Sequence, residues 1–204
     1  IDLVPVVIAL DHETRPQRAI QDEGRRQRTD IPVFRDAAVA IEQDREIHRQ
    51  LLDERKIGEI ISLEFNETLG FNHGGFIHQD WRRLRKNAGT HLLEKCCHDI
   101  DIVNWMVGAR ARFAASFGGL RYFTPANRAL ADKIGPSPSG KPAFQDWPTS
   151  TGNPFTSDKD IVDHQVAILE FENGVRATFH TNCAAGIPER RLLLLGLEGA
   201  IRAD

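Results

Sequence analysis

The sequence is poor in features that mark several classes of protein. Among its 204 residues are only three cysteines, Cys96, Cys97 and Cys183, which form neither a CxxC pair nor an even disulfide set, so we expect reduced, buried thiols. A formal net charge of -3 gives no basic surface of the kind that nucleic-acid binding requires. No apolar run approaches the roughly 20 residues needed to cross a bilayer, and the first residues lack a basic start. These absences predict a cytoplasmic protein that binds neither nucleic acid nor membrane.

A glycine-rich turn for a dinucleotide is also missing. No G-x-G-x-x-G pattern occurs in the sequence, although a pyrophosphate needs a tight glycine turn at the start of a helix. The pattern near the N-terminus nevertheless favours a parallel βαβ unit, with an apolar strand over residues 4–10, a helix over about 16–28 and a second strand over 31–34. The pattern then breaks down over residues 37–44. We expect that part of this segment, and a first strand before Ile1, are missing from the chain.

The remainder of the chain predicts a second domain of different texture. An amphipathic helix at about residues 45–55 is followed by alternating apolar and polar runs that are typical of antiparallel strands. We therefore predict an α/β plus α+β fold. A partial Rossmann-like βαβ segment over residues 1–44 is followed, over residues 45–204, by a substrate and oligomerisation domain with an open, mostly antiparallel sheet and one buried helix.

Two hairpins and one long connection are predicted within the second domain. The pair Asn173-Gly174 separates two alternating runs and is the strongest short signal for a hairpin. A further strand pair is expected around Gly199. Residues 122–160 are rich in proline, glycine and serine, and we predict that they form a long surface excursion or an active-site lid.

One predicted helix, over residues 90–107, carries the chemistry. Its face is broadly apolar, yet Glu94, His98, Asp101 and Trp105 recur four, three and four residues apart and so fall on one stripe. An imidazole between two carboxylates is costly to bury unless it faces a polar cavity. Because the unperturbed pKa of histidine lies near 6.5, we predict that His98 accepts a proton from a substrate hydroxyl while Glu94 or Asp101 orients its ring.

This helix and its surroundings resemble a known family. The string from Gly89 to Asp101, followed by Trp105 and Gly108, is similar to the substrate-domain helix of the glucose-fructose oxidoreductase and inositol dehydrogenase family. Other matching motifs are Lys56-Ile57-Gly58-Glu59-Ile60, Trp81-Arg82, Phe171-Glu172-Asn173-Gly174 and Gly196-Leu197-Glu198-Gly199. Each motif alone is weak, but together they are specific, and they span roughly residues 45–204.

The resemblance implies an NAD- or NADP-dependent oxidoreductase that converts a secondary alcohol of a sugar or polyol to a ketone. In the family, an acidic residue four positions before the histidine forms the proton-handling pair with it; here these are Glu94, where the family commonly has Asp, and His98. The family's lysine comes from a Glu-Lys-Pro motif that this sequence lacks, and Lys95 is not its equivalent. The resemblance also implies a homo-oligomer, a dimer or tetramer, formed through the open face of the sheet.

Five further residues are candidate ligand contacts. By the resemblance, Asp11 holds the adenosine ribose of NAD or NADP, although a solvated turn residue is an equal alternative. Trp81 is a candidate cofactor contact and Arg82 a candidate substrate contact, or the two form a Trp-Arg pair stacked on a sheet edge. His164 interrupts an otherwise apolar strand, and we expect it to contact the substrate, as we do Asp101.

Other interpretations of the same residues stay open. His98 could be a core histidine held by a carboxylate for structure alone. Glu94, His98 and Asp101 could together ligate a divalent metal ion, which would make the protein a metal-dependent enzyme. The missing glycine turn and the missing lysine favour a third possibility, a non-catalytic ligand-binding or regulatory module that has lost its nucleotide site.

Overall fold

The computed structural model describes residues 6–9, 45–136, 140–145 and 152–203. The strands in chain order are β1 (Val6–Ala9), β2 (Ile60–Gly70), β3 (Ala111–Gly119), β4 (His164–Phe171), β5 (Arg176–Ala185), β6 (Glu189–Gly196) and β7 (Gly199–Ala203). The α-helices are α1 (Arg45–Asp53), α2 (Phe71–Ile77), α3 (Arg85–Ala88), α4 (His91–Glu94), α5 (Cys97–Val107) and α6 (Ala129–Ile134), and short 3-10 helices are η1 (Trp81–Arg83) and η2 (Pro125–Asn127).

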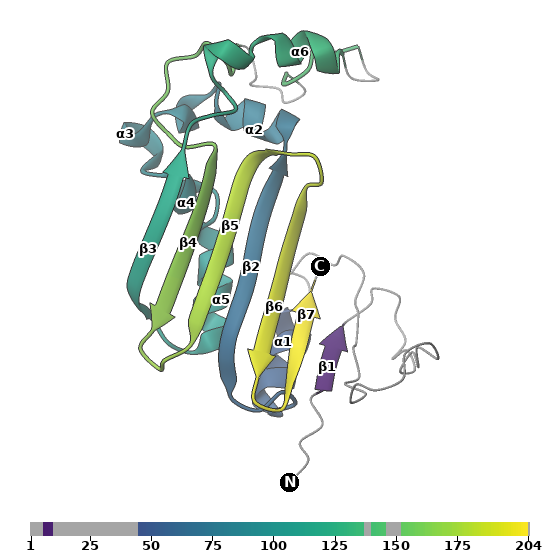
Figure 1. Cartoon of the computed structure of the whole chain (residues 1–204), viewed down its shortest axis with the longest axis vertical. Coiled ribbons are helices and arrows are strands. Elements are labelled where there is room, and N and C mark those ends of the chain that lie inside the picture. The colour runs from purple at the N-terminus through teal and green to yellow at the C-terminus, as the bar shows by residue number, and fades with distance from the viewer. Residues whose placement is uncertain (1–5, 10–44, 137–139, 146–151, 204) are drawn as a thin grey trace.

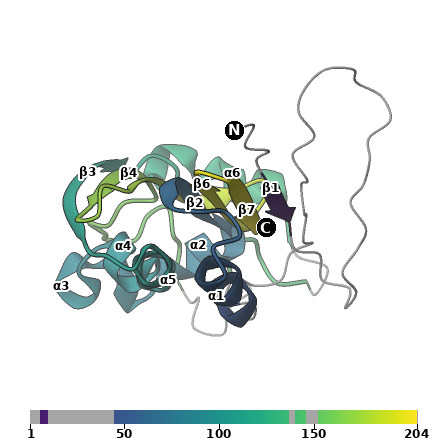
Figure 2. The same cartoon turned by 90° about the horizontal axis from the view of Figure 1, so that it is seen from below.

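All the described strands form one twisted sheet in the order β1-β7-β6-β2-β5-β4-β3 (Figure 1). Neighbouring strands are antiparallel except for the pairs β2–β5 and β1–β7, which are parallel. Helices α1 and α5 lie against one face of the sheet and the other face is left open, as the view from below shows (Figure 2). The predicted open, mostly antiparallel sheet is therefore confirmed.

Strand alternation divides the side chains between a helix face and an open face. Because successive residues of a strand point to opposite sides, Leu63 and Phe65 of β2 and Phe179 of β5 are buried against α5. The alternate residues of the strands point to the open face, where Phe117 of β3 and Ile168 of β4 are exposed. The hydrophobic core thus lies on one side of the sheet only.

The two predicted hairpins are confirmed. Between β4 and β5 the N–H of Gly174 donates to the carbonyl of Phe171, and Gly174 adopts a φ of +87°, which glycine tolerates because it has no Cβ. Strands β6 and β7 pair antiparallel around the turn at Glu198. Both turns fix the register that places the helix-face residues together.

A second hydrophobic core lies beyond the end of the sheet and changes the interpretation of residues 122–160. Phe123, Phe144 and Phe155 from this segment are fully buried, with ring centroids 5.0 to 5.8 Å apart. Most described residues of the segment are at least partly exposed, as expected for a surface excursion, but these three rings anchor it in a core of its own. It packs against α2 and closes the upper end of the sheet, where α6 also lies (Figure 1).

The N-terminal prediction is tested only in part. The strand expected over residues 4–10 is present as β1, and it lies at the edge of the same sheet, parallel to β7. The expected helix at 16–28 and the expected strand at 31–34 lie outside the described residues, as does Asp11. No helix within the described ranges is both long enough and apolar enough to span a bilayer.

Candidate active site

The start of α5 forms one wall of an open hollow that contains His98. The hollow has a volume of about 620 Å³ and is lined by Thr90, Leu92, Leu93, Cys97, His98, Ile100, Asp101 and Asn104. His98 and Asp101 are both exposed. The predicted interpretation of His98 as a sealed core residue is therefore wrong, and the imidazole is accessible to a small molecule.

The helix expected over residues 90–107 is broken in two. Helix α4 ends at Glu94 and α5 begins at Cys97, with Lys95 at φ −100° and Cys96 at φ −97°, ψ 7° between them. The break lets the Lys95 side chain reach β2, while Cys96 is buried against Thr181 of β5. Glu94 and His98 consequently belong to different helices, so the predicted stripe is interrupted after Glu94, while His98, Asp101 and Trp105 stay together on α5.

Glu94 is held by Arg82, another residue predicted for the site. The Arg82 Nε donates to Glu94 Oε1 at 2.6 Å, and Arg82 Nη1 pairs with the Asp80 carboxylate at 2.5 Å. The guanidinium lies 4.5 Å from the ring centroid of Trp81 and 5.0 Å from that of Phe76. The structure therefore brings Trp81, Arg82 and Glu94 together, in a cluster whose cation is already engaged by two carboxylates.

Behind His98, four charged side chains fill the space between the helix entry and the sheet. Lys95 Nζ lies 2.6 Å from Glu67 Oε1, Arg190 Nη2 lies 2.5 Å from Glu67 Oε2, and Arg190 Nε lies 2.8 Å from Asp99 Oδ1. Burial, a hydrogen bond with Glu67 and the charge of Glu67 raise the pKa of Asp99. Although burial opposes its charge, hydrogen bonds from Asp99, Lys95 and Arg190 lower the pKa of Glu67. We call these four residues the charge square.

His164 lies on the opposite side of the sheet from His98. It pairs with Asn182 across β4 and β5, and by alternation both residues belong to the open face. The His164 Nδ1 lies 2.8 Å from Asp163 Oδ1, and the almost fully buried Asp163 carboxylate also accepts from backbone N–H groups of residues 121–123. Those hydrogen bonds, against the cost of burial, lower the pKa of Asp163. One small substrate cannot contact both His98 and His164 of the same chain.

The three cysteines are free, and two of them are sealed in the core. Burial raises the pKa of the Cys96 thiol to about 12 and raises that of Cys183 well above its ordinary value. Cys97 is half-buried and lines the hollow beside His98. The prediction of buried thiols is confirmed for Cys96 and Cys183, and only Cys97 departs from it.

The lining of the hollow offers polar groups to a hydroxylated ligand. No group of three His, Cys, Asp or Glu side chains within the described ranges could hold a metal ion, which removes support from the metal interpretation of Glu94, His98 and Asp101. No lysine or arginine lines the hollow. By contrast, Asn104 lines the same hollow beside His98 and Asp101, and its amide group can form a hydrogen bond with a ligand hydroxyl.

The charge square was missed by inspection of the sequence alone. Lys95 and Glu67 lie 28 positions apart and Glu67 and Arg190 lie 123 positions apart, so no local pattern joins them. A signal was available, since Glu67 sits at a helix-face position of an alternating strand, where an apolar residue is expected. The partner of Glu67 could not be identified before the strand register was known.

This chain is similar to a known protein family and to an individual protein. The family model of the GFO/IDH/MocA C-terminal domain matches residues 47–202. YteT of Bacillus subtilis (strain 168), which carries the name of an oxidoreductase, is 32% identical over 81 residues, which cover 40% of this chain and 19% of YteT. The chain therefore matches only about a fifth of that relative.

Solved structures with the same fold include two that hold ligands. A levoglucosan dehydrogenase in complex with NADH and levoglucosan is 18% identical, with a TM-score of 0.55 over 81% of this chain and 39% of the other. The scyllo-inositol dehydrogenase of Lactobacillus casei, with bound NAD(H) and scyllo-inositol, is 20% identical, with a TM-score of 0.51 over 78% of this chain and 38% of the other. The chain spans about two fifths of these proteins, and the likeness shows the fold.

Proposed function

The chain belongs to the GFO/IDH/MocA family, and we propose that it is the substrate-facing part of an NAD- or NADP-dependent oxidoreductase that oxidises a secondary alcohol of a sugar or polyol to a ketone. The observation that carries the proposal is the exposed His98 imidazole in an open hollow beside Asp101 and Asn104. Imidazole, carboxylate and amide are all acceptors for hydroxyl groups. The ligands named for two solved relatives, levoglucosan and scyllo-inositol, are hydroxyl-rich rings of the kind these acceptors suit.

His98 is the proposed proton acceptor. Oxidation of a secondary alcohol removes a proton from the hydroxyl oxygen and a hydride from its carbon, and the neutral imidazole takes the proton. A bound nicotinamide supplies the acceptor for the hydride. Asp101 and Asn104 are proposed to hold neighbouring hydroxyls, so that the reacting oxygen faces His98.

Glu94 and Arg82 are proposed to act as a unit at the edge of this site. Because Arg82 already holds Glu94 at 2.6 Å, we propose that Glu94 assists His98 while anchored by this guanidinium. Arg82 and Trp81 remain our candidates for contact with substrate and nicotinamide, because Trp81 is exposed beside Arg82. Asp11 remains our candidate for the adenosine ribose.

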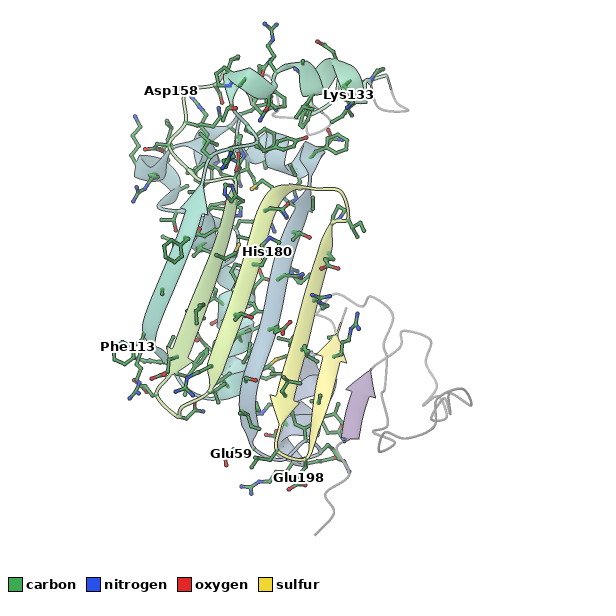
Figure 3. The ribbon with its side chains drawn as sticks, in the orientation of Figure 1. Glu59, Phe113, Lys133, Asp158, His180 and Glu198 are labelled. Atoms are coloured by element: carbon green, nitrogen blue, oxygen red, sulfur yellow. The ribbon has the colours of Figure 1, made fainter. Side chains whose placement is uncertain are left out.

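The open face of the sheet is the proposed surface for assembly with a second copy of the chain. Exposed apolar side chains gather on its β3–β4 side, namely Phe113, Phe117, Val166 and Ile168. Figure 3 shows Phe113 at this edge of the sheet and His180 on β5. Exposed apolar patches of this kind are typical of protein interfaces, because water is released when they are covered. Dimers or tetramers through this face are therefore part of the proposal.

The function is tested by replacing the proposed proton acceptor in the full chain. His98→Asn is expected to lower the rate of polyol-dependent NAD(P) reduction by about 100-fold or more, the usual cost of losing a general base. His180→Asn, on the open face, is the matched control and should leave the rate within about twofold. A His98→Asn rate within about threefold of the parent rate would remove His98 from the mechanism.

A non-catalytic binding module is the competing function, and the absence of a glycine-rich turn favours it. The two are separated by titrating the full chain with NADH and NADPH and following nicotinamide fluorescence. An oxidoreductase gives a saturable signal with at least one of the two. A binding module gives none, while a polyol could still bind the hollow and protect the Cys97 thiol from alkylation.

A further inference from the structure

The charge square joins the entry of α5 to the middle of the sheet. Its contacts run from Lys95 to Glu67, from Glu67 to Arg190 and from Arg190 to Asp99, with N–O distances of 2.6, 2.5 and 2.8 Å. Asp99 is in turn hydrogen-bonded to Glu67. The side chains of Glu67 and Asp99 are 8% and 4% exposed, so both carboxyl groups are almost withdrawn from water. The two cations are 18% and 23% exposed. The square is therefore interior structure, with its cations closest to the surface.

Two of the four members are fixed by the sheet and two by the helix entry. Glu67 of β2 and Arg190 of β6 face each other directly in the strand register, on the helix face. Lys95 lies in the break between α4 and α5, and Asp99 lies in the first turn of α5. His98 stands between Lys95 and Asp99 in the chain. The two anchors therefore bracket the imidazole, one on either side of it along the backbone.

Stability alone gives a poor reason for such an arrangement. Removing several ionisable groups from water costs more than a surface ion pair returns, and apolar residues of similar volume usually stabilise a core at least as well. What such a set of charge-assisted contacts does provide is direction, because each contact forms only in a narrow geometry. A straight helix from residue 90 to 107 would also place Lys95 and Asp99 four residues apart, where they could pair with each other. Instead Lys95 reaches Glu67 on β2, and Asp99 reaches Arg190 on β6 as well as Glu67.

We propose that Lys95, Glu67, Arg190 and Asp99 are positioning residues, which hold the break between α4 and α5 and thereby aim the His98 imidazole into the hollow. This inference rests on the proposed function only for its catalytic consequence. The geometric part, that the square controls the orientation of His98, stands on the contacts alone.

One member of the charge square, Asp99, can gain or lose a proton. The groups that face Asp99 are Glu67 of β2, Arg190 of β6 and Lys95 of the helix break, and His73 of α2 lies close enough to feel the charges of Lys95 and Glu67. Asp99 holds its proton to higher pH than an ordinary aspartate, because it is buried and hydrogen-bonded to Glu67. Ionisation of Asp99 places two carboxylates in contact. It thereby changes the contacts of the charge square, on which the direction of the His98 side chain depends.

The direct test follows the His98 ring itself and needs no substrate. The full chain is labelled with ¹³C at histidine Cε1, and the His98 signal is identified by its loss in His98→Asn. In the parent protein we expect the His98 signal to carry a second inflection near pH 8, because burial and the hydrogen bond with Glu67 raise the pKa of Asp99 to about 8. In Asp99→Asn the second inflection should vanish. Its persistence would overturn the proposal.

Amide exchange in the same samples reports on the helix break. The N–H of Ile100 donates to Cys96, and the N–H of Lys95 donates to His91, so both amides are protected while α4 and α5 are formed. Lys95→Met should accelerate exchange at these two amides by about tenfold or more, whereas Lys95→Arg, which keeps the charge, should stay within about threefold of the parent. Arg112→Met, which breaks an exposed ion pair with Glu170 on the open face, is the matched control and should change neither.

Kinetics provide the catalytic arm. Lys95→Met and Glu67→Gln should lower kcat by about tenfold while KM changes less than about twofold, since a misaimed base slows proton transfer without removing a substrate contact. Lys95→Arg should restore kcat to within about threefold. If Lys95→Met does not fold, Lys95→Arg and Asp99→Asn still give the inflection and exchange measurements. An unchanged His98 signal and unchanged exchange in every folded variant refutes the proposal, whereas absence of dehydrogenase activity in the parent refutes the proposed function and leaves the geometric test standing.

Discussion

The two faces of the sheet differ in what covers them. On the helix face, Phe65 and Phe179 stack with ring centroids 4.5 Å apart and are almost fully buried beneath α5. On the open face, Phe117 and Ile168 stand on strands of the same sheet with more than half of their surface exposed. Residue types are alike on the two faces, so the difference arises from alternation and from the helices that cover only one side. The helix face therefore folds the chain, and the open face is left for contacts outside it.

The difference between the two faces is tested most directly by removing one aromatic ring from each. Phe179→Ala leaves a cavity in the core beneath α5 and is expected to lower the free energy of unfolding by about 3 to 5 kcal/mol. Phe117→Ala removes a ring that already contacts water and should change it by less than about 0.5 kcal/mol. Urea unfolding followed by far-ultraviolet circular dichroism measures both. Equal losses for the two variants would show that the open face is also part of the folding core.

The pH dependence of stability tests the covered side further, because that side contains buried histidines. Burial lowers the pKa of both His78 and His91 to about 4, whereas in the unfolded chain each titrates near 6.5. The folded state disfavours protonation of these two rings. Their contribution to the free energy of unfolding is therefore fully present above pH 6.5 and is lost as the pH falls toward 4. At about pH 5 the loss amounts to about 2 kcal/mol for each histidine.

Two variants separate the contribution of His91 from that of the other titrating groups. The difference in unfolding free energy between about pH 7 and about pH 5 should shrink by about 2 kcal/mol in His91→Gln, because that ring no longer has to be protonated on unfolding. In His180→Gln, on the exposed face, the difference should match that of the parent. A His91→Gln variant with the full acid sensitivity of the parent would contradict the assignment of the effect to a buried neutral ring.

Much of the covered face could be predicted from the sequence, because it depends on short-range patterns. Alternation in β4 and β5 and the turn at Gly174 specify a hairpin with one apolar side. The accessibility of His98 was also expected, since a carboxylate-flanked imidazole is costly to seal in a core. These features need only the residues within about one helix turn or one strand.

The rest depends on contacts between residues far apart in the sequence. The broad apolar face of residues 90–107 favours one helix, and the break at Lys95 comes from a contact with Glu67 on β2 that no local pattern reveals. Likewise, the phenylalanines of the 122–160 segment lie among prolines and glycines, and their burial follows from packing against α2. Helix propensity is outweighed in the first case, and a loop-like composition in the second.

The smallest expected effect on folding is also the sharpest test of the open face. Phe117→Asp places a charge among exposed apolar side chains, so the stability of the isolated subunit should change by less than about 0.5 kcal/mol. If a second copy covers this face, the same charge is buried on association and should weaken it by about tenfold or more, because buried unpaired charge is costly. Sedimentation equilibrium over a range of protein concentrations measures the shift. Leu197→Asp, at the exposed turn between β6 and β7, is the matched control and should leave association unchanged. Identical association of Phe117→Asp and the parent would show that the partner does not bind this face.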